Sequence, residues 1–412
     1  MIIPPGLVNT QTSFDFRGQN FRFDLCQSLF SSHAVDRGSA LLLDALVPHL
    51  DARRPKRILD VGCGTGVLGI VLGGLYPGST VRGTDRDALA VCFARRNARL
   101  NGQSDAVFEG ALGTGDERPA DCIVCNLPAK AGEPVLGHLI RSCVDRIETS
   151  GVAGIVIVRT LEEMASEAMR RSGAEIRDLR RAAGHSVLIC SGKTAGNGRA
   201  PNGRSPCVAG AEKPADLSPY IRDHPRFCLQ SCTYELTTVY GISDFDSLGH
   251  GITLTAETML RAPRLRTVAI WNPGQGHLPV LCGKTMRPQS IRLIGRDLLA
   301  LQISRLNLLQ SGMSERCIGA THAAFPFDAD GRQLRAGEPC GLLVVAPDPD
   351  PEPALCETLL EKLRSGLGPD AWIVLTARSS AAYRILRHRR GFRLTYERKK
   401  HGYRTALLAR AG

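Results

Sequence analysis

The residues Asp60-Val61-Gly62-Cys63-Gly64-Thr65-Gly66 stand between two apolar runs. Glycines at a turn from strand to helix let a ligand approach the backbone, whose N–H groups then face that ligand. Asp85 lies nineteen residues after Gly66, where an acid accepts hydrogen bonds from ribose hydroxyls. The pattern predicts a site for a nucleoside-containing cofactor, in which Asp60 accepts from a ligand ammonium group, directly or through water.

The same stretch contains Gly64-x-Gly66-x-x-Gly69, which is also typical of dinucleotide-binding turns. Two further features argue against a dinucleotide. The first is Asn126-Leu127-Pro128-Ala129, which ends a later apolar run. The second is FSSHAVDRGSALLLDAL, residues 30–46, which lies just upstream of the glycines.

Together, these segments resemble the methyltransferase small domain superfamily, whose best-known members are rRNA guanine-N2 methyltransferases with one catalytic and one degenerate domain. The resemblance covers residues 20–190 and, more faintly, residues 230–412. It implies a class I methyltransferase fold with S-adenosylmethionine as the cofactor.

The resemblance also assigns roles to residues of this chain. Asn126 accepts the hydrogens of the target amine, and the backbone carbonyl of Leu127 or Pro128 is a second acceptor. Such a site works mainly by aligning the amine with the methyl group. The cofactor-binding residues that it implies are Asp60, Gly62, Cys63, Gly64, Gly66, Asp85, Arg86, Ala111 and Asn126.

The chain departs from the family pattern at two positions. Leu127 replaces a proline, and Ala129 replaces the aromatic residue that stacks on the substrate base. Base–aromatic stacking contributes about 1–3 kcal/mol per base, so its loss leaves a planar base substrate in question. The order of domains also differs, because the intact motifs here come first.

Alternating strands and helices predict how these residues are positioned. The first half reads as strands at 57–62, 81–85, 106–110, 122–126 and 154–159, helices at 134–148 and 162–173, and a final strand pair within 175–191. The ligand then lies at the carboxyl edge of a doubly wound parallel sheet.

The same series of elements occurs a second time. Residues 80–102 and 290–312 share eight identities at a constant offset of 210, which include Asp87 with Asp297 and Asn97 with Asn307. The predicted fold class is therefore α/β, with two tandem Rossmann-like sheets, the second degenerate. We expect a catalytic domain at 1–192, a linker at 193–216 and a degenerate methyltransferase-like domain at 217–412.

The second copy lacks the polar residues of the first. Aligned by their glycines, Asp60 becomes Asn272, Gly62 and Gly64 become Gly274 and Gly276, and Gly66 becomes Leu278. Asp85 becomes Gly295 and Asn126 becomes Ala346. A second active site is therefore not expected.

Composition narrows the function classes. The chain of 412 residues has no apolar run long enough to cross a membrane and no signal peptide pattern, so we expect a cytoplasmic protein. Most of its 14 cysteines stand in apolar runs, including Cys122 and Cys125, and are interpreted as core thiols rather than metal ligands. The net charge of +12 favours a polyanionic partner, although an arginine-rich composition explains it equally.

Three functions remain open from the sequence. The first is an S-adenosylmethionine-dependent N-methyltransferase that acts on an RNA base amine, most plausibly in rRNA. The second is a methyltransferase of a small-molecule or protein amine, which the missing aromatic residue would allow. The third is a non-catalytic scaffold that binds the cofactor or RNA. The sequence leaves the oligomeric state open, and a monomer is compatible with it.

Overall fold

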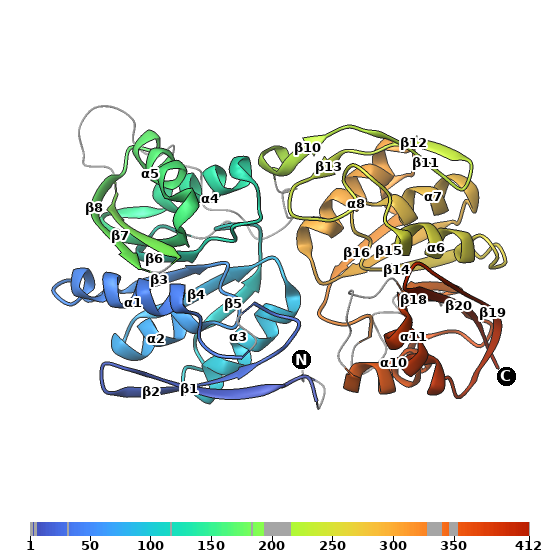
Figure 1. Cartoon of the computed structure of the whole chain (residues 1–412), viewed down its shortest axis with the longest axis horizontal. Helices are drawn as coiled ribbons and strands as arrows, with labels where there is room; N and C mark the ends of the chain where they lie inside the picture. Colours follow the sequence, from blue (N-terminus) through green and yellow to red (C-terminus); the bar gives the residue numbers. More distant parts are fainter. Residues whose placement is uncertain are drawn as a thin grey trace.

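The computed structural model describes residues 3, 6–30, 33–115, 118–182, 184–192, 216–327, 340–345 and 353–411. These residues form two α/β units that lie side by side (Figure 1). Each unit contains a seven-stranded sheet, and the strand order is the same in both: β5-β4-β3-β6-β7-β9-β8 in the first and β16-β15-β14-β17-β18-β20-β19 in the second. The prediction of two tandem Rossmann-like sheets is confirmed. The predicted linker, apart from Asp216, lies outside the described residues.

The first sheet follows the predicted alternation. Its strands are β3 (Arg57–Val61), β4 (Thr80–Asp85), β5 (Val107–Gly110), β6 (Ala120–Asn126), β7 (Ile147–Val158), β8 (Glu175–Ala182) and β9 (His185–Ser191). Its helices are α1 (Arg37–Leu50), α2 (Val67–Leu75), α3 (Ala88–Leu100), α4 (Glu133–Asp145) and α5 (Glu162–Arg171). β9 runs antiparallel to both β7 and β8, so the sheet is mixed at this edge.

Strand β7 begins seven residues before the predicted start at 154, and α4 ends at Asp145 rather than at residue 148. The polar sequence Glu148-Thr149-Ser150 interrupts the apolar pattern on which the prediction depended. The pairing of β6 with β7 nevertheless extends back to Ala120 and Ile147 through an irregularity in the register.

The second sheet repeats this arrangement. Its strands are β14 (Thr267–Trp271), β15 (Ser290–Gly295), β16 (Ile318–His322), β17 (Leu342–Val345), β18 (Trp372–Arg378), β19 (Phe392–Lys400) and β20 (Tyr403–Arg410). Its helices are α6 (His250–Met259), α7 (His277–Thr285), α8 (Leu298–Gln310), α10 (Pro353–Gly366) and α11 (Ser379–Arg387). Short strands precede it: β10 (Ile221–Asp223), β11 (Arg226–Leu229), β12 (Cys232–Glu235) and β13 (Thr238–Val239).

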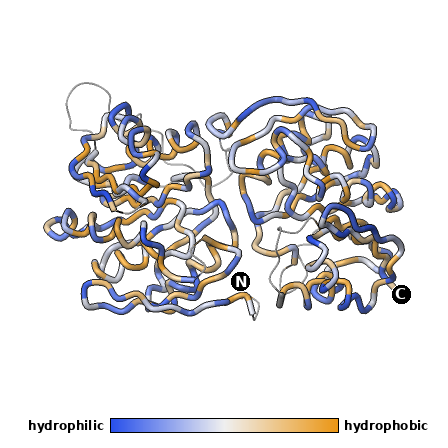
Figure 2. Tube along the Cα trace, in the orientation of Figure 1, coloured by the Kyte–Doolittle hydropathy of each residue, from blue (hydrophilic) through white to orange (hydrophobic). Residues whose placement is uncertain are grey.

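Alternate residues of the central strands pack on opposite faces of each sheet. In β6, Cys122 and Val124 belong to the core beneath α1 and α2, whereas Ile123 and Cys125 belong to the core beneath α4 and α5. Both cysteines are buried, which agrees with core thiols. In Figure 2, hydrophobic segments lie inside each unit and hydrophilic segments lie around them.

A hairpin that the sequence analysis did not predict covers α2 and α3. It consists of β1 (Thr10–Phe16) and β2 (Gln19–Leu25). Asn97 of α3 joins it to the glycine turn, because its amide bonds the backbone N–H and C=O of Asp24 and the C=O of Thr65. Asn307 makes the equivalent bonds to Thr237 and Gln275 in the second unit. The asparagine repeated at the 210-residue offset is therefore structural.

The two units meet at equivalent residues. Ala88 N–H donates to the carbonyl of Arg296 at 2.9 Å, and Leu298 N–H donates to the carbonyl of Arg86 at 2.9 Å. Asp87 pairs with Asp297 as an antiparallel bridge. Because each partner lies 210 residues from its equivalent, the contact has the symmetry of a two-fold axis.

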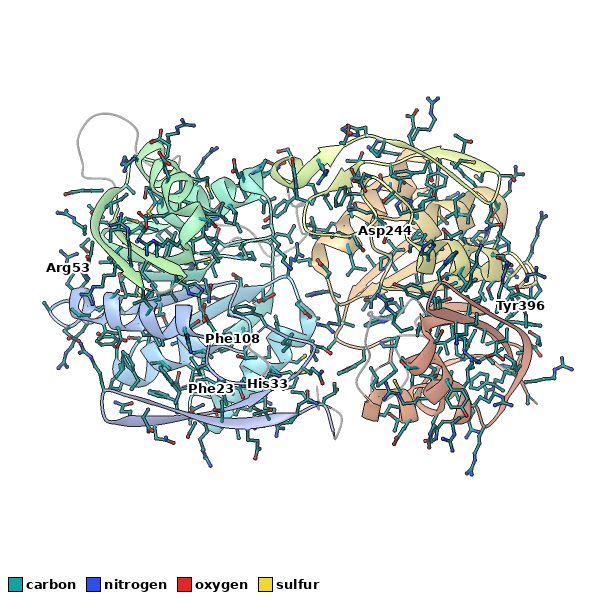
Figure 3. All side chains as sticks on the ribbon, in the orientation of Figure 1. Phe23, His33, Arg53, Phe108, Asp244 and Tyr396 are labelled. Atoms are coloured by element: carbon teal, nitrogen blue, oxygen red, sulfur yellow. The ribbon has the colours of Figure 1, made fainter. Side chains whose placement is uncertain are left out.

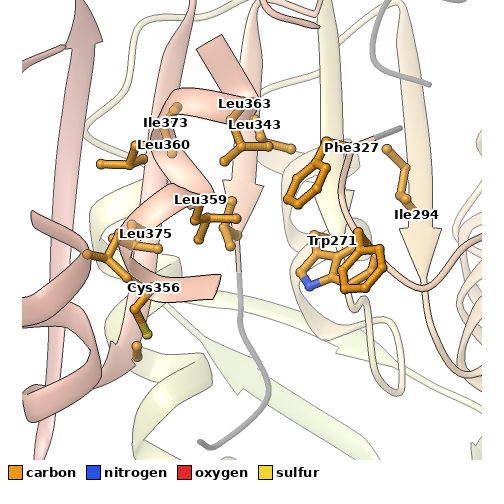
Figure 4. Close-up of a cluster of buried hydrophobic side chains, with 14 of the residues drawn as sticks. Trp271, Ile294, Phe327, Leu343, Cys356, Leu359, Leu360, Leu363, Ile373 and Leu375 are labelled. Carbon is orange, nitrogen blue, oxygen red and sulfur yellow. The ribbon is translucent and has the colours of Figure 1, made fainter. Parts of the chain in front are cut away.

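Hydrophobic residues continue the contact between the units. Leu89 and Phe93 of α3 belong to the same buried cluster as Trp271 and Phe325 of the second unit. Figure 4 shows the part of this cluster around Trp271, Phe327 and α10. The two units therefore share a core as well as polar contacts. None of the described helices is long and apolar enough to span a membrane.

Candidate cofactor and acceptor site

The glycine turn after β3 has a backbone that side chains would strain. Gly62, Gly64 and Gly66 have φ angles of 68°, 54° and 88°, all in the left-handed region that favours glycine. A Cβ on Gly66 would lie 2.8 Å from Ile70 Cδ1 and 3.2 Å from the Ala94 backbone, so α2 and α3 also require a glycine here. The turn places the start of α2 at the carboxyl edge of the sheet, as predicted for a cofactor site.

Asp60 holds a buried acceptor in this turn. Its Oδ2 accepts a hydrogen bond from Gly69 N–H at 2.8 Å, and its Oδ1 is buried without a hydrogen-bond partner among the described residues. Burial raises the pKa of Asp60 to about 7. An unpaired buried oxygen is costly, and a ligand ammonium or a bridging water would satisfy it. These features fit the ammonium acceptor predicted for Asp60.

Asp85 ends β4 beside the glycine turn. Its Oδ2 accepts from Gly64 N–H at 2.9 Å and its Oδ1 from Asp87 N–H at 2.8 Å. Burial raises the pKa of Asp85 to about 6. The backbone bonds fix the carboxylate, and each oxygen keeps further acceptor capacity for a pair of ribose hydroxyls.

Cys63 belongs to the same turn. Its side chain is buried, and burial raises the pKa of the thiol. The thiol is therefore neutral and inert, and Cys63 contributes packing and backbone to the site rather than a nucleophile.

Arg86 and Ala111 are engaged in ways that the sequence did not indicate. The Arg86 guanidinium lies 3.2 Å from Asp297 and donates to the carbonyl of Gly241 at 2.9 Å, so this side chain binds the second unit. Ala111 N–H donates to the carbonyl of Asp85 at 3.0 Å. The cofactor role of Arg86 stays a prediction, with its side chain bound to the second unit, and Ala111 offers its carbonyl and methyl group to a ligand.

Asn126 is held in a fixed orientation at the end of β6. Its Nδ2 donates to Asp36 Oδ2 at 3.1 Å and to Ser39 Oγ at 3.2 Å. Both donor hydrogens are thus used, while no described residue donates to Oδ1. The side chain presents an acceptor, which the predicted contact with a substrate amine requires.

The residues after Asn126 determine which carbonyl is the second acceptor. The carbonyl of Pro128 accepts from Ala131 N–H at 2.9 Å, which closes a turn, and Leu127 N–H donates to Val156. The Leu127 carbonyl has no donor among the described residues. Of the two candidates from the sequence, Leu127 is the one whose carbonyl is free, while Pro128 shapes the turn.

Asp36 and Ser39 are site residues whose role the sequence analysis did not assign. Asp36 caps α1: its carboxylate accepts from Gly38 N–H at 2.7 Å and from Ser39 Oγ at 2.5 Å, and it also holds Asn126. A Cβ on Gly38 would lie 2.9 Å from Asp36 Oδ1 and 3.2 Å from His185, which explains the glycine. The only signal was the segment 30–46 itself, because contact with Asn126 spans 90 positions in the sequence.

The strands correct the alignment of the second copy by two residues. β3 and β14 are offset by 210, so Asp60 corresponds to Ile270, Gly62 to Asn272, Gly64 to Gly274 and Gly66 to Gly276. The turn keeps its shape, with φ angles of 51°, 60° and 101° at Asn272, Gly274 and Gly276. The prediction that Asp60 becomes Asn272 is wrong, because it matched glycine letters rather than strand ends.

The second copy has lost further polar groups at this edge. Gly295 stands at the position of Asp85, and the N-cap of α6 is Gly249, which has no side chain to cap the helix, whereas Asp36 caps α1. Ala346, the predicted equivalent of Asn126, lies outside the described residues. A cavity of about 470 Å³ exists in the second unit, but it is lined by residues of β11, β12 and the ends of α7 and α8, including Arg226, Tyr234 and Lys284, and not by these positions.

Several known proteins share part of this sequence. The sequence profile of the methyltransferase small domain family matches residues 20–188. An uncharacterized Bacillus subtilis protein, YbxB, is 30% identical over 173 residues, which cover 39% of this chain and 84% of YbxB. The ribosomal RNA small subunit methyltransferase C of Stutzerimonas stutzeri is 36% identical over 132 residues, 31% of this chain and 39% of that protein.

One solved structure matches both units. The 16S rRNA methyltransferase RsmC of T. thermophilus, in complex with AdoMet and guanosine, aligns with a TM-score of 0.63 at 16% identity over 98% of this chain and 99% of its own. This likeness confirms the tandem fold. The sequence match to the S. stutzeri enzyme spans about two fifths of that protein.

Proposed function

Because the chain belongs to the methyltransferase small domain family, we propose that it is an S-adenosylmethionine-dependent N-methyltransferase that acts on a base amine of ribosomal RNA. The orientation of Asn126 carries this proposal. A side-chain amide whose two hydrogens are bound by Asp36 and Ser39 offers only its oxygen to the substrate. An exocyclic amine is the complementary group, since it donates two hydrogens.

The residues at the carboxyl edge of the first sheet have separate roles in binding the cofactor and the amine. Asp60 and Asp85 would hold the ammonium and ribose groups of the cofactor, and the glycine turn leaves room for it. When bound, S-adenosylmethionine supplies an electrophilic methyl group. Asn126 Oδ1 and the Leu127 carbonyl accept the two hydrogens of the amine, which directs the nitrogen lone pair away from them. Fixing this alignment in advance lowers the entropic part of the barrier.

The RNA substrate is supported by the names of the relatives and by charge. The S. stutzeri relative is named a ribosomal RNA methyltransferase, and the T. thermophilus structure holds guanosine. The net charge of +12 suits a polyanion. Such a substrate would place the protein in the cytoplasm.

A small-molecule or protein amine is the second candidate, and Ala129 favours it. This residue is exposed and has no ring to stack on a base. The Asn126 acceptor would serve such an amine equally. A non-catalytic scaffold has less support, because it gives no reason for Asp36 and Ser39 to orient an acceptor.

Transfer of tritiated methyl from S-adenosylmethionine to unmodified rRNA tests the proposal. We expect label on RNA with the native protein and at least about a hundredfold less with Asn126→Ala, by analogy with the removal of one positioned polar group from an active site. Calorimetry should show unchanged cofactor affinity in the variant. Cofactor binding without label on rRNA would contradict the RNA substrate and favour the amine alternative.

A further inference from the structure

The second unit lies directly against the loop that carries the acceptor site. Gly132, at the start of α4, has a φ of 89°, and a Cβ there would lie 2.8 Å from Cδ1 of Tyr240. Val239 and Tyr240 also pack in the hydrophobic cluster that includes Leu127 and α4. The segment around β13 therefore packs next to the start of α4, close to the turn at residues 128–131.

An arginine of the second unit is held between two rings at this place. The guanidinium carbon of Arg222 lies 3.7 Å from the ring centroid of Phe245 and 5.5 Å from that of Tyr240. Contacts of this kind attract a cation to the ring face. They also restrict the guanidinium, so that less side-chain entropy remains to be lost when a ligand binds.

Arg222 has no acidic partner in the described part of the chain. Its side chain is exposed. The neighbouring acids are engaged elsewhere: Asp223 Oδ1 accepts from His224 N–H at 2.7 Å, and Asp244, labelled in Figure 3, accepts from Gly249 N–H at 2.7 Å and from Ser243. Many other arginines of this protein form ion pairs, as Arg226 does with Glu235. Arg222 thus presents an exposed guanidinium that forms no ion pair with the described carboxylates.

A second cation comes from the first unit. Lys130, on the turn that follows Pro128, is exposed and has no carboxylate within ion-pair distance among the described residues. Arg222 contacts Tyr240, whose ring lies against Gly132, and Lys130 stands two residues before that glycine, so the two cations belong to the same contact between the units. Two cations at this place suit a negatively charged polymer that passes the acceptor site.

We infer that Arg222, fixed by Phe245 and Tyr240, binds a backbone phosphate of the RNA strand that carries the acceptor base, with Lys130 beside it. The planar guanidinium matches two phosphate oxygens, and arginine with aromatic rings is a recurrent surface for unpaired nucleotides. The inference rests on the proposed RNA substrate. It gives the degenerate unit a part in substrate binding.

Filter binding of unmodified rRNA, measured over a range of salt concentrations, tests this contact apart from catalysis. We expect Arg222→Ala to weaken binding about tenfold, as for the loss of a charged hydrogen bond, and to reduce the slope of log affinity against log salt by about 0.7. Phe245→Ala should weaken binding about threefold with the slope unchanged, because it frees the cation without removing it. Arg222→Lys should also keep the slope.

Arg99→Ala is the matched control. Arg99 is an exposed arginine in the last turn of α3, toward the sheet edge opposite Asn126, and its removal should leave RNA binding unchanged. Equal affinity and salt dependence for the Arg222→Ala and Arg99→Ala proteins would overturn the inference, as would a native protein that does not bind rRNA. Methyl transfer to the same RNA is scored separately. If the RNA is labelled but Arg222→Ala binds it normally, only the phosphate contact is overturned. If Arg222→Ala weakens RNA binding but the native protein transfers no label, only the proposed methylation is contradicted.

Discussion

The strand that ends at Val61 and the strand that ends at Trp271 lead into glycine turns of the same shape, yet the two turns hold different chemistry. In the first unit, Asp60 lies beneath the turn with a buried oxygen for which the described part of the chain supplies no partner. In the second unit, Ile270 occupies that position and is fully buried. Gly295 likewise replaces Asp85.

What both units keep is the framework. Asn97 and Asn307 make equivalent bonds between turn and hairpin, and the strand orders are identical. The difference shows which groups serve the fold and which serve the ligand. Buried carboxylates that are not needed for folding are costly, so a unit without a ligand gains by losing them.

The largest effect is expected from Asp85→Ala, which removes the carboxylate at the position that Gly295 occupies in the second unit. We expect cofactor affinity to fall about a hundredfold or more, because two hydrogen bonds to a charged acceptor contribute about 1.5–3 kcal/mol each. Isothermal titration calorimetry with S-adenosylmethionine measures this. Asn272→Gly, which gives the second turn the glycine of the first, is the control and should leave affinity unchanged. Equal affinities for the Asp85→Ala and native proteins would refute the assignment.

An intermediate effect is expected from pH at Asp60. Burial raises its pKa in the folded state to about 7, above the unfolded value of about 3.9. The protonated carboxyl therefore stabilises the protein at low pH, and this contribution is lost as the pH rises from about 4 to 7, by at most about 4 kcal/mol. The second unit has no such group at Ile270.

The Asp60→Asn variant isolates this effect. Between pH 5 and about 8, the melting temperature of the cofactor-free variant should rise relative to the native protein as the pH increases. Its affinity for S-adenosylmethionine should be about tenfold lower near pH 8, where the native carboxylate is charged. Parallel melting curves across this range would show that Asp60 is already ionised or is paired in the folded state.

The smallest effects are expected at the contact between the units, where two equivalent arginines differ. Arg296 donates twice to Asp87 and its side chain is 14% exposed, whereas Arg86 lies 3.2 Å from Asp297 and is 37% exposed. We expect Arg296→Ala to cost about 1–3 kcal/mol of unfolding free energy and Arg86→Ala less than about 1 kcal/mol. Thermal denaturation measures both. Arg86→Ala should leave cofactor affinity within about twofold. A larger loss would support the cofactor-binding role that the sequence predicted for Arg86.

The sequence was sufficient for the fold and for the placement of Asp60, Asp85 and Asn126 at one sheet edge. These residues stand at or next to the ends of apolar strands, and parallel strands align their carboxyl ends. The contact of Asn126 with Asp36 could not be predicted in this way, since it depends on how α1 crosses the sheet. The ion pair of Arg86 could not be predicted for a similar reason: its partner Asp297 belongs to the other unit.

The alignment of the second copy failed for a different reason. Matching the glycines of the two repeats gave a sequence offset of 212 residues, whereas the hydrogen-bonded strands are offset by 210 residues. Asn272 adopts a φ of 51° at the position of Gly62, as asparagine can. A turn can thus keep its conformation after a glycine is replaced, so glycine spacing alone is a weaker guide than the end of the preceding strand.

The bridge between Asp87 and Asp297 joins residues at equivalent positions of the two units. A residue that meets its own equivalent lies on a two-fold axis, and a surface of that kind is complementary to itself. Two separate copies of one ancestral unit would join through it without any change of geometry. The tandem chain therefore has, within one polypeptide, the geometry of a two-fold symmetric dimer of the repeated unit.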